Sequence, residues 1–425
     1  MRRVLVFGLV LAACAEIPDR VPTGTEPSSF TVSVDVWSGS ELTITSAGLR
    51  STMNLPAVLL DGSALPTRRI DDTTLAATLP DSPGPHAVRL AGTGFDPQSV
   101  NVYLRGFAGY VEGPALSGRT EPGRDPRYVF GNGPLSLRRW NVEANKAIDL
   151  GDSVHAVFCT RGIGPGPNVG EIVLTPMCES GRWNVWHTEP LYPLADTAAV
   201  RTARIVAVLA TGRWVVLGMD TVFVNACSAG TCTTEALPGT DGRDVIRSPR
   251  GDRAALLARV VGDPAAPGAP VLDATLGTVA YRVTALRDAR GAAFSLDGET
   301  LYLAGAEGAS GPFTLAAVRA GDGAPLSSAR LDFEPCAVAV DPAASWLYVA
   351  GSTATGQGRL VVFDPLSLEG IASLHVTSVV TVGGSTRLCR IMPNPVGHLV
   401  YVVDTWAGAH DAAARAHLFR FETPR

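Results

Sequence analysis

The stretch that decides the fold is AAFSLDGETLYLAG, residues 292–305. Its first apolar segment ends at the polar turn Ser295–Glu299, and a second apolar segment follows directly. Short apolar runs on both sides of an Asp-Gly turn are typical of two antiparallel β-strands. The stretch therefore predicts a strand, a tight turn and a second strand.

This strand–turn–strand pattern recurs along the chain. Five windows carry it: VAVLATGRWVVLG (206–218), VIRSPRGDRAALLA (245–258), AAFSLDGETLYLAG (292–305), CAVAVDPAASWLYVAG (336–351) and CRIMPNPVGHLVYVVD (389–404). The turn residues Thr211, Arg250, Asp297, Asp341 and Asn394 are 39, 47, 44 and 53 residues apart. A repeat of about 46 residues is the size of a four-stranded β-propeller blade. Residues 106–425 then have room for about seven blades.

The last predicted strand, HLFRF at 417–421, is only the third strand of its blade. We expect a strand from the start of the propeller, Phe107–Glu112, to complete that blade. Such closure removes the exposed sheet edges at the two ends of the ring.

Residues 30–105 have a different pattern. Phe30, Val32, Val34 and Val36 alternate with polar residues, which predicts one half-buried strand. Further short strands are predicted at 42–45, 57–60, 74–78, 86–90 and 100–104, separated by turn residues. Strands at this spacing favour a small immunoglobulin-like sandwich, so the predicted fold class is all-β.

Two family resemblances accompany these patterns. The text DDTTLAATLP, followed by a Pro-Gly turn and an outgoing strand, resembles the IPT/TIG family of immunoglobulin-like domains. That resemblance implies a spacer or contact module. SLDGETLYLAG and VDPAASWLYVAGS resemble the YVTN-type seven-bladed propellers of bacteria, in which a Ser-x-Asp-Gly turn joins the first two strands of a blade.

The first residues, MRRVLVFGLVLAAC, are typical of an export signal. LAAC resembles the bacterial lipobox, which implies cleavage after residue 13 and a lipid on Cys14. An ordinary signal cleaved near Ala13 is the alternative. Residues 14–29 contain three prolines and no apolar periodicity, so we expect a flexible tether. The predicted location is a bacterial membrane, with the outer membrane favoured, and a periplasmic or surface-exposed propeller.

The charge balance argues against nucleic acid as a partner. The chain has 35 Lys and Arg against 40 Asp and Glu, and loss of residues 1–13 would bring the net charge from −5 to about −7. Nucleic-acid binders generally need a basic surface. After the signal, no window approaches 18 consecutive apolar residues, so the lipid is the only membrane attachment that the sequence predicts.

One candidate ligand site follows from the repeat. Counting back seven residues from each turn residue reaches Arg204, Arg243, Arg290, Glu334 and Arg387. In a propeller these positions ring the mouth of the central channel. Arginine there would suit an anionic ligand, a glycan or an acidic partner. The alternative is that these residues form salt bridges between blades.

The six remaining cysteines predict disulfides, since the chain is expected to be exported. Cys227 and Cys232 flank a four-residue hairpin loop. Counting back five residues from the turn residues places Cys336 and Cys389 at the same point of adjacent blades, which leaves Cys159 with Cys178. No spacing typical of a zinc site is present, so we expect no metal and no cofactor.

Catalytic motifs are absent from the sequence, so we name no catalytic residue. Trp140, Trp183 and Trp186 could stack on a sugar or pack between blades. We expect a non-catalytic binding or scaffolding lipoprotein of the cell envelope. The alternatives are a propeller enzyme of the lactonase or lyase type and a component of an envelope assembly machine.

The disulfide pattern can be tested directly. Proteolysis of the exported protein under non-reducing conditions should yield linked peptides for Cys227–Cys232, Cys336–Cys389 and Cys159–Cys178, identified by mass spectrometry. A peptide that joins Cys336 to Cys159 or Cys178 would contradict the prediction.

Overall fold

The computed structural model contains two compact units. The first combines residues 1–33, 42–77 and 87–102, and the second combines residues 34–41, 78–86 and 103–425. The structure describes residues 28–33, 36–52, 54–80, 82–92, 95, 97–112, 117–122, 125, 127–132, 137–144, 146–150, 160–165, 171–176, 183–188, 191–197, 205–209, 213–217, 221–228, 231–238, 240–260, 268–308, 311–341, 346–376, 388–394, 399–404 and 417–422. Within these residues no helix has the length and apolarity needed to cross a membrane.

The first unit contains short strands in two pairing groups. One group has the order β1-β3-β7-β6, with β1 (Thr31–Val32), β3 (Glu41–Thr45), β7 (Thr74–Thr78) and β6 (Thr67–Arg69). In the other group, β4 (Ala57–Leu60) pairs with β5 (Ser63–Ala64) and with β8 (Gly84–Ala91). Leu42, Ile44, Leu75, Val58 and Leu90 are buried, so both groups contribute to the core. A single 3-10 turn, Ala47–Ser51, is the helix described here.

The strand predicted over residues 30–36 is wrong as one continuous element. The structure divides it into β1 and β2 (Val36–Trp37). β1 pairs antiparallel with β3, whereas β2 pairs in parallel with β9 (Val100–Glu112). The two halves thus pair in different sheets, which a sequence alternation of period two does not reveal.

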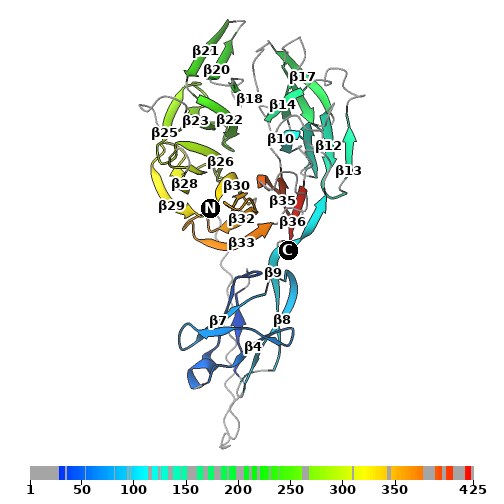
Figure 1. Cartoon of the computed structure of the whole chain (residues 1–425), viewed down its shortest axis with the longest axis vertical. Coiled ribbons are helices and arrows are strands. Elements are labelled where there is room, and N and C mark those ends of the chain that lie inside the picture. Colours follow the sequence, from blue (N-terminus) through cyan, green and yellow to red (C-terminus); the bar gives the residue numbers. More distant parts are fainter. Residues whose placement is uncertain are drawn as a thin grey trace, which may run out of the picture. The chain divides into compact units, whose positions relative to one another are not determined.

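The second unit contains seven blades among its described strands, and they follow one another around a ring (Figure 1). We number them in chain order. Blade 1 is β10 (Ser117–Pro122), β11 (Tyr128–Asn132), β12 (Leu137–Asn141) and β13 (Lys146–Asp149); blade 2 is β14 (Thr160–Pro165), β15 (Glu171–Pro176), β16 (Trp183–Thr188) and β17 (Leu191–Thr197); blade 3 is β18 (Ile205–Val208), β19 (Trp214–Leu217), β20 (Thr221–Ser228) and β21 (Thr231–Pro238).

The remaining blades contain the sequence repeats that resemble one another best. Blade 4 is β22 (Thr240–Arg247), β23 (Arg253–Val260), β24 (Ala269–Asp273) and β25 (Val279–Val283); blade 5 is β26 (Asp288–Phe294), β27 (Thr300–Ala306), β28 (Phe313–Arg319) and β29 (Pro325–Leu331); blade 6 is β30 (Glu334–Val340), β31 (Leu347–Ser352), β32 (Gly358–Phe363) and β33 (Gly370–Val376); blade 7 has β34 (Leu388–Asn394), β35 (Leu399–Asp404) and β36 (His417–Glu422). The five sequence windows form the first two strands of blades 3 to 7, as predicted.

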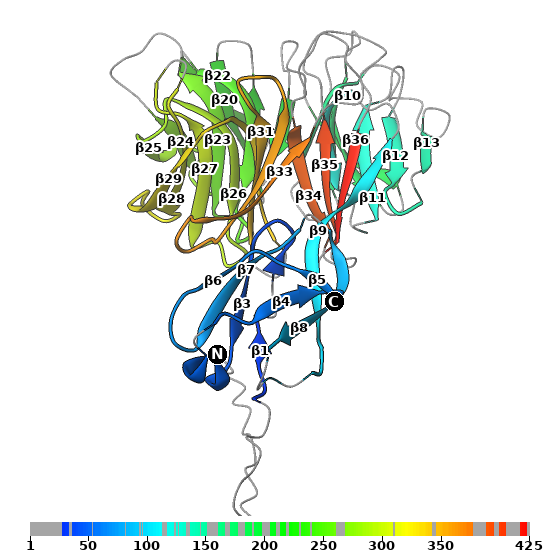
Figure 2. The same ribbon diagram turned by 60° about the horizontal axis from the view of Figure 1, so that its bottom comes forward.

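Blade 7 takes its fourth strand from the beginning of the unit. β36 pairs antiparallel with β9, with His417 opposite Glu112 and Phe421 opposite Phe107. The two strands lie side by side in Figure 2. The predicted closure by residues 107–112 is therefore confirmed.

The apolar cores lie between blades. Ala254 and Leu256 of β23 belong to a cluster with residues of blade 3, whereas their neighbours Ala255 and Leu257 belong to a cluster with residues of blade 5. Successive side chains of a strand point to opposite faces of its sheet. Inner strands of blades 4 to 6 are thus buried on both faces, which explains why they are apolar at successive positions.

A β-bulge recurs on the first strand of six blades. In each case the pairing with the second strand slips near the start of the first strand. The extra residues are Gly118 with Arg119 in blade 1, Arg161 in blade 2, Arg243 in blade 4, Arg290 in blade 5, Cys336 in blade 6 and Cys389 in blade 7.

Two glycines lie opposite these bulges, Gly305 in blade 5 and Gly351 in blade 6. A Cβ on Gly305 would collide with the carbonyl oxygen of Asp288, and a Cβ on Gly351 would collide with that of Glu334. The close approach of backbone therefore requires glycine at both positions.

The glycine requirement gives a stability prediction. Gly305→Ala and Gly351→Ala should each lower the free energy of unfolding by about 1–3 kcal/mol, because the bulged strand must move away. Urea unfolding followed by tryptophan fluorescence measures this change. Gly321→Ala is the matched control, since no atom lies within 4 Å of its added Cβ. Equal stability of all three variants would contradict the packing argument.

Candidate functional site

The charged residues of the predicted ligand ring do not all occupy equivalent positions in their blades. Arg243 and Arg290 are equivalent, because each is the extra residue of its bulge. Glu334 is not equivalent to them: it lies opposite Ser352, two residues before the bulge residue Cys336, and corresponds to Asp288 in blade 5. Arg204 and Arg387 lie outside the described residues, as does Cys14.

Glu334 lies two residues before its bulge because the turn residues used for counting, Asp297 and Asp341, are not equivalent. Asp297 lies inside the turn of blade 5, three residues after the end of β26, whereas Asp341 follows β30 directly. Asp341 donates its N–H to the carbonyl of Trp346, as Ser295 does to the carbonyl of Thr300. Asp341 therefore corresponds to Ser295, and counting from Asp341 reaches a position two residues too early.

Arg290 connects blades 5 and 6 through two carboxylates. Its Nε donates to Oδ2 of Asp288 at 2.8 Å, and its terminal nitrogen forms an ion pair with Glu334. Its guanidinium also lies over the ring of Phe313, 5.2 Å from the centroid. The Asp288 side chain is 5% exposed and that of Arg290 is 17% exposed, so much of this cluster is shielded from water.

These contacts favour the structural interpretation of Arg290. Its guanidinium already binds two acidic groups, which reduces its capacity to bind an added anion. A buried carboxylate without its cation would carry a large desolvation cost, so Asp288 and Arg290 depend on one another. The side chain of Arg243 lies outside the described part of the structure.

A second group of charges comes from three blades and was not found from the sequence. Burial lowers the pKa of the Arg247 guanidinium in β22, while the carboxylates of Glu121 in β10 and Glu171 in β15 oppose that shift. Glu121 is itself buried. The repeat windows did not include blades 1 and 2, so no pattern in the sequence connected these acids with Arg247.

The cysteines agree with the predicted placement as far as the structure describes them. Cys227 and Cys232 lie directly opposite each other in the hairpin of β20 and β21. Cys336 is disulfide-bonded, and it occupies the same bulge position as Cys389 of the next blade. The pairing of Cys336 with Cys389 stays a prediction. Cys159 and Cys178 lie outside the described residues.

Two further sequence hypotheses concern Trp140 and Asp297. Trp140 is fully buried in β12, so it packs in the core and presents no surface to a sugar. The carboxylate of Asp297 accepts hydrogen bonds from the Ser295 hydroxyl and from the N–H of Glu299. These bonds lower the pKa of Asp297 and show that it caps its turn. Among the described residues, no group of three His, Cys, Asp or Glu side chains could share a metal ion.

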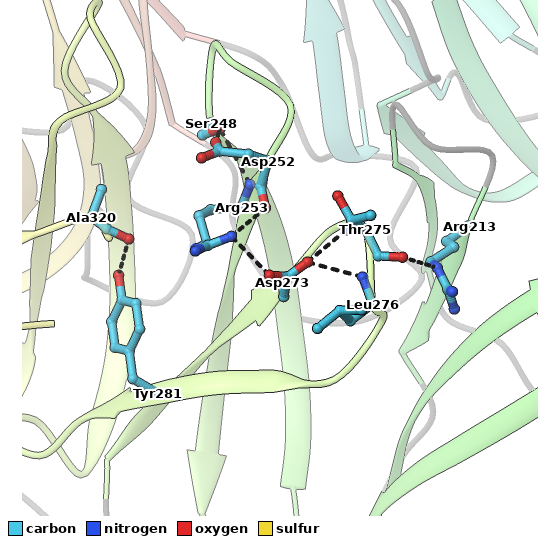
Figure 3. Close-up of polar contacts among 9 residues, drawn as sticks. All are labelled: Arg213, Ser248, Asp252, Arg253, Asp273, Thr275, Leu276, Tyr281 and Ala320. Carbon is cyan, nitrogen blue, oxygen red and sulfur yellow. Dashed lines mark hydrogen bonds and ion pairs between the residues drawn. The ribbon is translucent and has the colours of Figure 1, made fainter. Parts of the chain in front are cut away.

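A polar network connects the turns of blades 3, 4 and 5, as Figure 3 shows. Arg213 donates from Nε to the carbonyl of Thr275 at 2.6 Å, and the Tyr281 hydroxyl donates to the carbonyl of Ala320 at 2.8 Å. Between them, Asp273 accepts the N–H groups of Thr275 and Leu276 and forms an ion pair with Arg253 at 3.0 Å. Side chains of one blade thus hold the turn of the next.

The structural role of Arg290 can be tested through the stability of the protein. Arg290→Met should lower the free energy of unfolding by about 3 kcal/mol, since Asp288 would stay buried without its cation. Adding Asp288→Asn to that variant should restore part of the loss, measured by urea unfolding. Arg319→Met, which removes an exposed ion pair with Asp322, is the control and should change stability by less than about 1 kcal/mol. An undiminished stability of Arg290→Met would contradict the structural role.

Comparison with known proteins identifies the fold. No protein-family profile matches the chain, and no curated protein matches it. Among solved structures, a chain of the mitotic checkpoint complex is 9% identical, with 75% of this chain and 94% of that chain covered at a TM-score of 0.54. The β-propeller domain of Cps50 (Swd1) from Myceliophteria thermophila is 8% identical, with 75% and 100% covered at a TM-score of 0.52. Hydrazine synthase from Kuenenia stuttgartiensis is 13% identical, with 71% and 96% covered at a TM-score of 0.48. The first two of these structures, together with the blades described above, show that the chain is an all-β protein that contains a β-propeller.

Proposed function

We propose that this chain is a non-catalytic binding or scaffolding protein of the bacterial cell envelope. A lipid on Cys14 attaches it to a membrane, and residues 14–29 act as the tether. Residues 30–105 form an IPT/TIG-like spacer, and the YVTN-type propeller binds the partner. The support for the location is the sequence MRRVLVFGLVLAAC, which combines a basic tip, an apolar core too short to span a membrane and a terminal cysteine.

The contacts of Arg290 bear on which kind of partner the propeller binds, a small anionic ligand or a protein. This residue belongs to the predicted ligand ring, yet its charge is neutralised by Asp288 and Glu334, and its guanidinium lies over the ring of Phe313. Charges used in this way stabilise the contact between blades. The propeller then serves as a rigid support, and its partner is a protein of the envelope. A small anionic ligand at the channel mouth would have to rely on other residues, of which Arg243 is the candidate.

Lipid attachment can be tested by fractionation of bacteria that produce the full chain. Wild-type protein should sediment with the membranes and incorporate radioactive palmitate. Cys14→Ser should lose the label and appear in the soluble or uncleaved fraction, because the thiol that accepts the lipid is absent. Cys227→Ser, which changes another cysteine, should keep the label. Palmitate on Cys14→Ser, or none on wild type, would contradict the anchor.

The non-catalytic role has its own measurement. Purified full-length protein should not accelerate the hydrolysis of a panel of lactones above the buffer rate, with or without added divalent metal ions. Chemical crosslinking in intact cells should join the chain to another envelope protein. Lactone turnover, or the absence of every crosslinked species, would overturn the proposal.

A further inference from the structure

Exposed leucines gather at one face of the propeller. Antiparallel strands reverse direction in turn, so the loops between strands one and two and between strands three and four open on the same face of each blade. Leu276, Leu296 and Leu366 lie in such loops of blades 4, 5 and 6, and Leu326 lies near the start of the outer strand of blade 5. Their exposed fractions are 64%, 47%, 86% and 52%. We call these four residues the leucine face.

In the described part of the second unit, most of the exposed large apolar side chains belong to the leucine face. The other large apolar residue exposed there is Ile148, in the outer strand of blade 1. Single exposed apolar residues are ordinary, but four of the five in the described part of this unit lie on one face, in three successive blades, which favours a contact surface there. Because the bulge arginines lie at the start of each first strand, the leucine face is the opposite face from the predicted ligand ring.

Two of these leucines are held in the same way. The N–H of Leu276 donates to Asp273 at 2.9 Å, and the carbonyl of the preceding Thr275 accepts from Arg213 of blade 3. The N–H of Leu366 likewise donates to Asp364 at 2.9 Å.

The carbonyl that precedes Leu366 is bound by the neighbouring blade, as the carbonyl that precedes Leu276 is. Pro365 accepts a hydrogen bond from the Tyr302 hydroxyl of blade 5 at 3.2 Å. Each turn is therefore fixed by its own aspartate and by the neighbouring blade. A side chain on a fixed turn loses little freedom on binding, which lowers the cost of association.

The turn of Leu296 is also fixed from both sides. Asp297 caps it, and Glu299 at its end forms an ion pair with Arg250 of blade 4 at 2.5 Å. Leu276, Leu296 and Leu366 are therefore presented by turns of three consecutive blades, and each of these turns is tied to an adjacent blade.

The charge around the leucines is mostly negative, although Arg213, Arg253 and Arg319 flank the same turns. The turns 248–252, 274–278, 295–299, 320–324 and 364–369 contain one arginine against six acidic residues. Hydrogen bonds from backbone N–H groups contribute to lowering the pKa values of Asp322 and Asp364, and the Ser295 hydroxyl lowers that of Asp297. These carboxylates stay negative at any physiological pH.

We propose that the leucine face docks a protein that presents an aliphatic recess bordered by lysine or arginine side chains. This inference deepens the proposed binding role and rests on it. An anionic membrane surface is disfavoured, because acidic residues surround the leucines. A second copy of the chain, related by two-fold symmetry, would bring the same acidic turns together and is disfavoured for the same reason.

Photocrosslinking in the native cells tests the docking face. A benzophenone amino acid replaces Leu276 or Leu366 in the full-length protein, and the same replacement at Ile148 serves as the matched control. We expect positions 276 and 366 to crosslink the same protein, and position 148 to crosslink it much less. Mass spectrometry should place the attached peptide next to lysine or arginine in that protein.

Substitutions then test the chemistry of the contact. With the crosslinker at position 276, Leu366→Ser and Glu369→Lys should each reduce the crosslinked product roughly tenfold, because they remove an apolar anchor or reverse a rim charge. Ile148→Ser should leave it unchanged. Circular dichroism of each variant checks that the propeller remains folded.

The outcomes separate the docking face from the broader function. A dimer of the chain, a lipid adduct, or equal crosslinking from position 148 would overturn the docking proposal. If chemical crosslinking still joins the chain to an envelope protein in that case, the binding role stands and only the face is wrong. If neither method yields a partner, the proposed function fails as well.

Discussion

The packing of each blade against both of its neighbours is the constraint on which the rest of the propeller depends. Ala254 and Leu256 face blade 3, and Ala255 and Leu257 face blade 5, so neither face of the inner strand β23 is in contact with water there. A sheet buried on both faces cannot end without exposing an apolar surface. The ring must close, and the pairing of β9 with β36 closes it.

Much of this fold could be predicted from the sequence because two-sided burial leaves a strong pattern. Apolar strands on both sides of a polar turn identified blades 3 to 7, and the missing strand of blade 7 led to residues 107–112. Blades 1 and 2 have no comparable windows, so their register could not be assigned. The segment 34–41 was also unpredictable. Trp37 packs into the core of blade 6, with its ring 6.4 Å from that of Trp346, although its sequence suits the first domain.

The candidate site was predicted less well, for a physical reason. Turns tolerate differences in length and in the position of their capping aspartate, whereas a bulge is fixed by the pairing of two strands. Counting from Asp297 therefore reached the bulge residue Arg290, and counting from Asp341 reached Glu334 instead of Cys336. The error nevertheless brought together two true neighbours, because Arg290 and Glu334 form an ion pair between blades. Burial and pairing, which decide what Arg290 can bind, are not visible in the sequence.

The closing strand also has a consequence for the order in which the molecule can form. Residues 106–112 pair with residues 417–422, so this contact joins segments some 300 residues apart. During synthesis from the N-terminus, β9 is complete long before its partner β36 exists. Contacts between such distant segments carry a large loop-closure entropy and form slowly. The ring is therefore expected to acquire its full cooperativity only when residues 417–422 pair with β9, which makes this pairing a late step in the assembly of the propeller.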